Sequence, residues 1–237
     1  MTSAFDALGY LSADVEDARR ALRDRHSADI AKVEALCAEA LGDLAEIEGD
    51  RTQAFLVGLG FWLRCIEACQ GAVLLIERGL PTAPFPVLRT AFECLFFACA
   101  LWRNPGLAER LQVGHDVERV KQAKAMIAAG AASRIPAERV LDLESVAAEA
   151  TPLGSGLSVW EAAVAADLRH EYETAYRGFG IAGAHASLRS LDDYFDERAD
   201  GSFTLRFEPN SSRTAWLLGL VATCLKGGVD RCRQARS

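Results

Sequence analysis

The sequence predicts an all-α protein, a single helical bundle of about seven or eight helices around a central antiparallel helical hairpin. Strong helix formers dominate the composition, with 41 alanines and 29 leucines among 237 residues. Clusters of proline and glycine divide the chain into blocks of helical length. Two consecutive blocks are apolar nearly all round, and helices of that kind lie in the middle of a bundle.

The central hairpin is expected over residues 51–103. One helix should occupy 51–79 and the next 86–102, because the three prolines between them cannot continue a helix. A loop this short makes the two helices antiparallel neighbours. We interpret the chain as one domain, 1–237, in three parts: an acidic helical segment 1–50, the hairpin 51–103 and the surrounding helices 104–237.

The bounds of the flanking helices are predicted from the same helix-breaking and helix-capping residues. Residues 12–49 are expected as one helix or as two joined near His26-Ser27. A capping box, Ser158-Val-Trp-Glu161, starts a later helix, which is expected to end where Gly178-Phe-Gly180 breaks it. The other predicted elements are helices over 107–132, 136–150, 158–177, 184–197 and 211–233, and a short strand or extended loop over 202–207.

The charge is concentrated at the N-terminus. Residues 1–50 carry 12 acidic and 5 basic side chains, whereas residues 51–237 carry 21 of each. This balance argues against binding of duplex DNA. The chain starts without the basic and apolar regions of a signal peptide, and its most apolar stretch, Phe55 to Ile76, is interrupted by charged residues. We therefore predict a cytoplasmic protein with no membrane partner.

Seven cysteines are present, an odd number that is typical of free thiols in a reducing compartment. Cys65 and Cys69 share a helix face, but no C-x-x-C spacing occurs. We interpret the cysteines as small buried hydrophobic residues. The sequence therefore predicts neither a metal site nor a cofactor.

Charged residues inside the apolar hairpin mark the candidate site. Arg89 and Glu93 are four residues apart and Arg64 and Glu67 are three apart, so each pair shares a helix face. Burial of an unpaired charge is costly, so such groups occur in ion-pair networks or in polar sites. Two interpretations stay open at this point: a buried network that fixes the helix register, and a polar pocket.

The segment Leu88-Arg-Thr-Ala-Phe-Glu93 resembles the L-R-[ST]-x-[FL]-E helix of an uncharacterised bacterial all-helical family, a domain of unknown function. That family has a tyrosine and then a His-Ala/Pro-Ser segment further along, which match Tyr176 and His185-Ala-Ser187. Gly178-Phe-Gly180 replaces the small polar residue usual between them. The resemblance spans roughly residues 30 to 235. It implies that the Arg, Glu, Tyr and His meet in space, and it implies no established activity.

A second, more distant resemblance concerns Arg110-Leu-Gln-Val-Gly-His115. This segment is similar to the R-x-x-x-x-H signature of the HEPN helical ribonucleases, although Leu111 replaces the polar residue that commonly follows the arginine. The resemblance implies that Arg110 and His115 act on RNA phosphate at a dimer interface. The alternative is an ordinary exposed helix face.

Two functions follow, and whether the chain is an enzyme stays open between them. In the first, a pocket binds a small anionic or nucleotide-like ligand or RNA, including metal-independent RNA hydrolysis of HEPN type, and a homodimer fits this function. In the second, a non-enzymatic interaction or scaffold protein uses the same residues as a structural ion-pair network. The candidate catalytic residues are Arg89, Glu93, Tyr176 and His185, and the candidate ligand-binding residues are Arg64, Glu67, Arg110 and His115.

Overall fold

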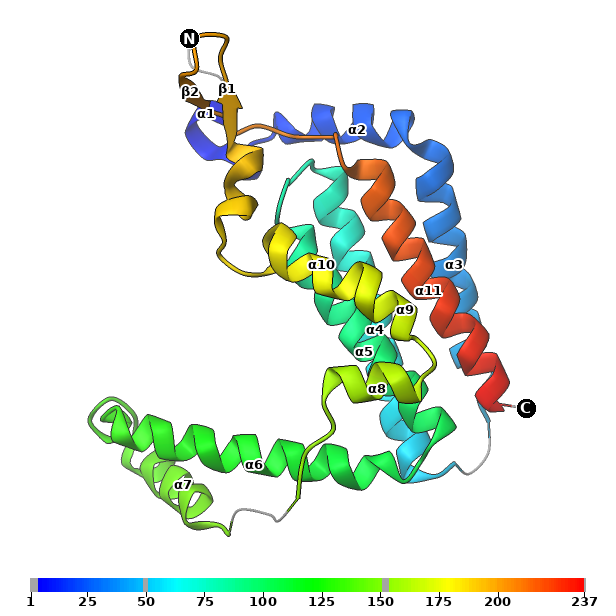
Figure 1. Cartoon of the computed structure of the whole chain (residues 1–237), viewed down its shortest axis with the longest axis vertical. Helices are drawn as coiled ribbons and strands as arrows, with labels where there is room; N and C mark the ends of the chain where they lie inside the picture. Colours follow the sequence, from blue (N-terminus) through cyan, green and yellow to red (C-terminus); the bar gives the residue numbers. More distant parts are fainter. Residues whose placement is uncertain (1–3, 49–50, 151–153, 237) are drawn as a thin grey trace.

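The computed structural model describes residues 4–48, 51–150 and 154–236, and within these ranges the protein is all-α, as predicted. Eleven α-helices, α1 to α11, account for most of the described residues, and the only sheet among them has two short strands. A bundle of long helices forms the body, and one helical pair projects from its base (Figure 1). The count exceeds the seven or eight helices expected.

The central hairpin is present and antiparallel. It consists of α4 (Gln53–Glu77), which the Thr52 hydroxyl caps, and α5 (Pro84–Arg103), which begins with proline in its first turn. A Cβ on Gly58 would meet Trp102, and a Cβ on Gly71 would meet Val87, so the start of α4 lies against the end of α5. Helix α5 begins two residues earlier than predicted because proline suits the first helical position.

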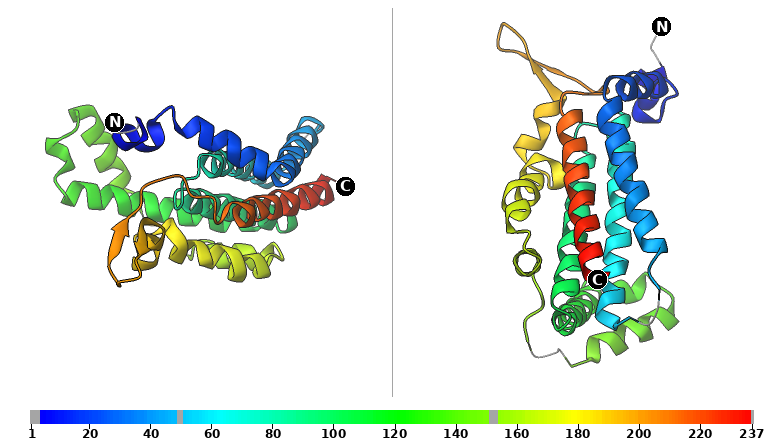
Figure 2. Two further views of the ribbon diagram at one scale, coloured as in Figure 1. Left: turned by 90° about the horizontal axis from the view of Figure 1, so that it is seen from above. Right: turned by 90° about the vertical axis from the view of Figure 1, so that its right-hand side faces the viewer.

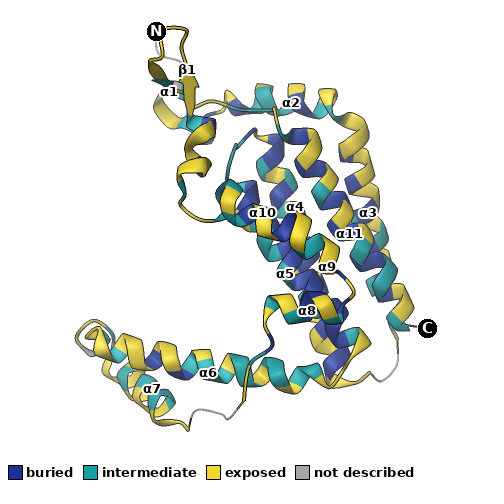
Figure 3. Cartoon of the chain, in the orientation of Figure 1, coloured by how far each residue is buried: buried dark blue, intermediate teal, exposed yellow. Residues whose placement is uncertain are grey.

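Two further helices complete the body of the bundle. Helices α3 (Ser27–Ala45) and α11 (Thr214–Arg236) pack on each other, and α11 also packs on both central helices. All four run side by side (Figure 2). Buried residues concentrate between them, most densely on α5 (Figure 3). Burial of these aliphatic and aromatic side chains is the main stabilising contribution.

The N-terminal segment forms two helices rather than one, at the junction that the sequence indicated. Helix α2 (Val15–Arg25) ends at His26 and α3 begins at Ser27. A short helix, α1 (Ala4–Leu8), precedes them and was not predicted. Helix α2 crosses the end of the bundle, where Arg19 and Arg23 both pair with the buried carboxylate of Glu77.

The projecting pair consists of α6 (Leu107–Ala128) and α7 (Ala137–Ala148), close to their predicted bounds. Most residues of these two helices are exposed or half-buried (Figure 3). The chain then returns to the bundle through α8 (Val159–Ala165), which packs on α5 and begins with the predicted Ser158–Glu161 capping box.

The prediction of one helix over 158–177, broken at Gly178–Gly180, is right at its start and wrong about its end and about the break. The helix ends at Ala165, and Asp167 adopts a left-handed conformation with φ of 58°. A second helical segment then runs from Arg169 to Ala184 without ending at the glycines. It consists of α9 (Arg169–Glu171), a π-helical turn (Tyr172–Tyr176), α10 (Arg177–Phe179) and a second π-helical turn (Gly180–Ala184).

The helix predicted over 184–197 is also wrong. His185 is extended, a 3₁₀ segment follows over Leu188–Tyr194, and strand β1 (Phe195–Glu197) pairs antiparallel with β2 (Phe203–Leu205). The second strand lies within the short strand or extended loop predicted over 202–207. Alternating Phe203 and Leu205 indicated that strand, whereas nothing in Phe195–Glu197 distinguishes its partner from a helix end.

Helices α4 and α5 are long and apolar enough to cross a membrane by length and composition alone, which is weak evidence for a membrane location. In the fold, 61% of the most apolar window of α5 is buried and 33% of that of α4. The burial of α5 is what a core helix requires. The absence of a membrane partner stays a prediction.

Candidate functional site

Three of the four predicted catalytic residues meet on one side of the bundle. Arg89 and Glu93, one turn apart on α5, form an ion pair with 3.3 Å between Nε and Oε1. Tyr176 reaches them from the π-helical turn that packs over α5, and it donates a hydrogen bond of 2.5 Å from its hydroxyl to Oε1 of Glu93. Nη2 of Arg89 donates in turn to the Tyr176 hydroxyl.

Tyr176 is the most buried residue of this cluster, with only 4% of its surface exposed. The guanidinium carbon of Arg89 lies 4.1 Å from the centre of the Tyr176 ring, a favourable cation–π position. Burial and then the hydrogen bond to Glu93 raise the pKa of Tyr176 well above its usual value, so the phenol stays protonated. The Tyr176 hydroxyl therefore fixes Glu93 by donating to it and Arg89 by accepting from it, and it does not act as a base.

His185 stands beside this cluster with an exposed side chain. A Cβ on Gly180 would lie 3.4 Å from Cδ2 of His185 and 3.6 Å from Nη1 of Arg89, so the imidazole and the guanidinium face the same point. Within the described residues neither Nη1 of Arg89 nor the imidazole makes a hydrogen bond. The resemblance therefore predicted correctly that Arg89, Glu93 and Tyr176 meet, and His185 lies beside them.

The cluster is open to solvent on the side of Arg89 and Glu93, whose side chains are 26% and 32% exposed. Two π-helical turns position residues of the cluster, one ending at Tyr176 and the other ending just before His185. Single π-helical turns within helices are frequent at functional sites. The extra residue in each turn rotates the side chains that follow, which no periodicity in the sequence predicts.

Arg64 and Glu67 were predicted to bind the ligand with the cluster, but they lie away from it. Both are exposed on the outer face of α4, where they line a shallow groove with Leu41 of α3. Neither forms an ion pair with any described residue. Their three-residue spacing was sufficient to place them on one face but did not show which way that face points.

Arg110 and His115 do not form a site together. Arg110 pairs with Glu161 at 2.8 Å and donates to the carbonyl of Gly156 at 3.1 Å, so it fastens the start of α8 to α6. His115 is exposed and lines a groove of about 890 Å³ between α6 and the beginning of α4, to which Arg110 does not contribute. The hydrogen bonds from Ser158 and Arg110 lower the pKa of Glu161 to about 2.

Cysteine side chains supply a group of metal-ligand type that the sequence did not predict. Cys65 and Cys69 of α4 meet Cys224 of α11, and their sulfur atoms all lie within 4.8 Å of one another. Only the spacing of the first two was visible in the sequence, because Cys224 joins them through the packing of a distant helix. All seven cysteines are free thiols.

The arrangement defines an all-α protein with an arginine, a carboxylate, a tyrosine and a histidine gathered where a π-helical segment crosses a central helix. A family of unknown function (DUF5677) matches residues 55–203, and the chain belongs to that family. The matched range contains Arg89, Glu93, Tyr176 and His185. Comparisons with curated proteins and with solved structures gave no match. The resemblance to an uncharacterised helical family is thereby confirmed, and no relation to HEPN ribonucleases is shown.

Proposed function

We propose that the cluster of Arg89, Glu93, Tyr176 and His185 binds a small anionic ligand, of phosphate or nucleotide type, between Arg89 and His185. One observation carries the proposal: Nη1 of Arg89 and the exposed imidazole of His185 face one point across a glycine, and neither has a partner among the described residues. An anion at that point receives hydrogen bonds from both groups.

The other members of the cluster prepare Arg89 for this role. Glu93 engages Nε and Tyr176 engages Nη2, so the guanidinium is held in one orientation before a ligand arrives. Holding a group in its bound orientation reduces the entropy lost on binding. The carboxylate of Glu93 partly neutralises the positive charge of Arg89, and the hydrogen bond from Tyr176 partly neutralises the carboxylate. Because Arg89 is partly neutralised, we expect the site to bind an anion with moderate affinity.

Metal-independent RNA hydrolysis is a finer proposal that the exposed His185 favours. An imidazole beside an arginine provides a proton acceptor and a phosphate contact, the two roles that such a reaction needs. Arg110 and His115 have no part in this version, because Arg110 is engaged by Glu161. A labelled RNA incubated with the protein in excess chelator tests it, with His185→Ala as the inactive variant.

Thermal melting with inorganic phosphate, nucleotides and short RNAs tests the binding proposal. We expect at least one of these to raise the melting temperature of the wild type, and Arg89→Ala and His185→Ala to remove the shift. Arg64→Ala is the matched control, since Arg64 is an exposed arginine of the same hairpin outside the cluster. If no ligand shifts the wild type and Arg89→Ala melts far lower, the cluster is a structural network and the scaffold function takes its place.

A further inference from the structure

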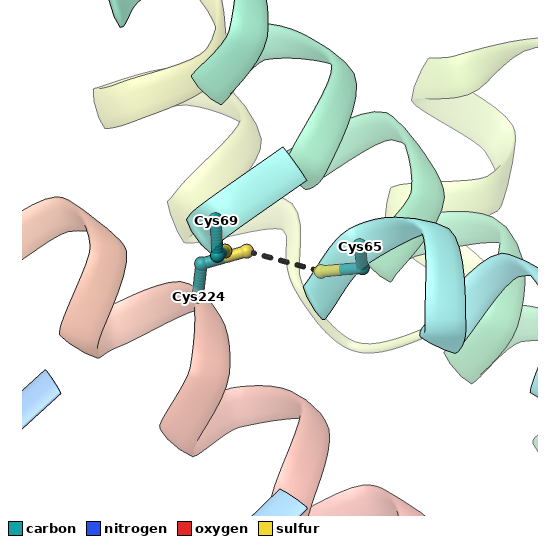
Figure 4. Close-up of side chains that lie close together, drawn as sticks. All are labelled: Cys65, Cys69 and Cys224. Atoms are coloured by element: carbon teal, nitrogen blue, oxygen red, sulfur yellow. Dashed lines mark hydrogen bonds between the residues drawn. The ribbon is translucent and has the colours of Figure 1, made fainter. Parts of the chain in front are cut away.

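The three sulfur atoms of Cys65, Cys69 and Cys224 lie in the middle of the bundle, remote from solvent. All three residues have no exposed surface. The Sγ atoms of Cys65 and Cys224 are 3.5 Å apart, and each of the three lies within 4.8 Å of the others. Cys65 and Cys69 extend from α4 and Cys224 extends from α11, and the three side chains converge between these helices (Figure 4).

We propose that Cys65, Cys69 and Cys224 form a three-coordinate site for Cu(I). The proposal concerns the helix core and is independent of the anion site. Thiolate sulfur is the ligand that soft ions such as Cu(I) prefer. A metal–sulfur bond of about 2.3 Å, the length known for zinc thiolates, separates sulfur ligands by roughly 4 Å. The sulfur atoms of Cys65 and Cys224 are 3.5 Å apart and no separation in the cluster exceeds 4.8 Å, a range that contains this value.

The number of ligands favours Cu(I) over Zn²⁺. Structural zinc sites have four protein ligands in a tetrahedron. Among the described residues, no fourth histidine, cysteine, aspartate or glutamate joins the three sulfurs. Since all three residues are fully buried, no side of the cluster is open to a water that could complete the tetrahedron. Three-coordinate geometry, which Cu(I) accepts, is the geometry that this cluster offers.

Metal binding requires the thiolate form of cysteine. The protons that the three thiols lose pass to solvent, and the oxidation state of Cu(I) does not change.

Cys37 is the least buried cysteine of the chain. It lies half-buried on α3, outside the group of three. A variant of Cys37 therefore separates Cu(I) binding at a partly exposed thiol from binding at the buried cluster.

Anaerobic titration with Cu(I) against a chromophoric Cu(I) chelator tests the site. We expect one tightly bound ion per chain, with the luminescence of a copper thiolate shielded from water. Cys69→Ala and Cys224→Ala should each weaken binding at least tenfold and abolish the luminescence. Cys232→Ala is the matched control, because Cys232 is a fully buried cysteine of the same helix α11 outside the cluster.

Three outcomes would overturn the proposal. They are Cu(I) affinity that is unchanged in both cluster variants, Cu(I) binding that is lost only in Cys37→Ala, and tighter binding of Zn²⁺ than of Cu(I). Circular dichroism shows whether each variant is folded. Should a cluster variant unfold, X-ray absorption of the wild-type copper complex decides the matter, since three sulfur neighbours support the site and any other ligand set contradicts it.

Discussion

Two arginine–glutamate networks in this protein use the same residue types and differ in how completely they are closed. At the end of the bundle, Glu77 is 3% exposed, with Oε1 engaged by Arg23 and Oε2 by Arg19. On the side of α5, Glu93 is 32% exposed and shares a single oxygen between Arg89 and Tyr176. In the first network both carboxylate oxygens of Glu77 have an arginine partner. In the second, Nη1 of Arg89 has no partner among the described residues and can donate to a ligand.

The difference separates a structural charge from a binding group. A buried carboxylate requires its partners, because an uncompensated charge in the interior is costly. Arg89 has the reverse arrangement: its partners orient it while Nη1 stays without a partner among the described residues. We therefore expect changes at the Glu77 network to alter stability most, and changes at Arg89 and His185 to alter ligand binding.

The largest effect should come from the double variant Arg19→Ala/Arg23→Ala. It leaves Glu77 buried without its two partners, and the loss of partners from a buried charge lowers the free energy of unfolding by about 3–5 kcal/mol. Urea unfolding followed by circular dichroism measures this. Arg20→Ala removes an arginine of the same helix that is 66% exposed, and it should change stability by less than about 0.5 kcal/mol.

Tyr176→Phe should have an intermediate effect. It keeps the buried ring and removes the hydroxyl that donates to Glu93 and accepts from Arg89. The loss of a hydrogen bond to charged groups predicts a decrease of about 1–3 kcal/mol in unfolding free energy. Tyr172→Phe is the control, since Tyr172 stacks on Tyr176 at 5.0 Å and its hydroxyl makes no hydrogen bond in the described part of the chain. Equal losses in both variants would contradict the assigned role of the Tyr176 hydroxyl.

The network of Arg110 and Glu161 provides a smaller, pH-dependent effect. The folded state lowers the pKa of Glu161 from 4.5 to about 2, so its ionised form stabilises the fold above that range. This contribution is lost as the pH falls from about 4.5 toward 2. Glu161→Gln should therefore reduce the acid dependence of the melting temperature. Glu138→Gln, at an exposed position of α7, should retain it, and equal curves for the two variants would exclude this role.

The smallest effect on stability should come from His185→Ala. The exposed imidazole makes no hydrogen bond with any described residue, so its removal should change the free energy of unfolding by less than about 0.5 kcal/mol. The ligand-induced rise in melting temperature should nevertheless disappear. A large loss of stability would place His185 with the structural residues instead.

Local chemistry made most of the fold predictable from sequence. Gly79, with a left-handed φ of 71°, follows the end of α4, proline occupies the first turn of α5, and Ser158 with Glu161 forms the capping box that begins α8. The prediction failed at Gly178–Gly180, because glycine lowers helix propensity but packing on α5 maintains the helix there. It failed again at Asp167, whose left-handed backbone is uncommon for any residue other than glycine.

The candidate site was predictable only in part. The four-residue spacing of Arg89 and Glu93 was sufficient to predict that they share a face. Their meeting with Tyr176 depends on a π-helical turn and a contact across more than eighty residues, which only the family resemblance indicated. No sequence pattern or family resemblance indicated Cys224, so its position close to Cys65 and Cys69 became visible only in the folded chain.

The histidine signals in a nuclear magnetic resonance titration with inorganic phosphate are the most direct test of an anion site between Arg89 and His185. The chain contains four histidines, so His26, His115 and His170 serve as internal references for His185. At constant ionic strength we expect a saturable shift of the His185 imidazole alone, absent in Arg89→Ala. A shift of His185 no larger than that of the other three, or one unchanged in Arg89→Ala, would contradict an anion site between these residues.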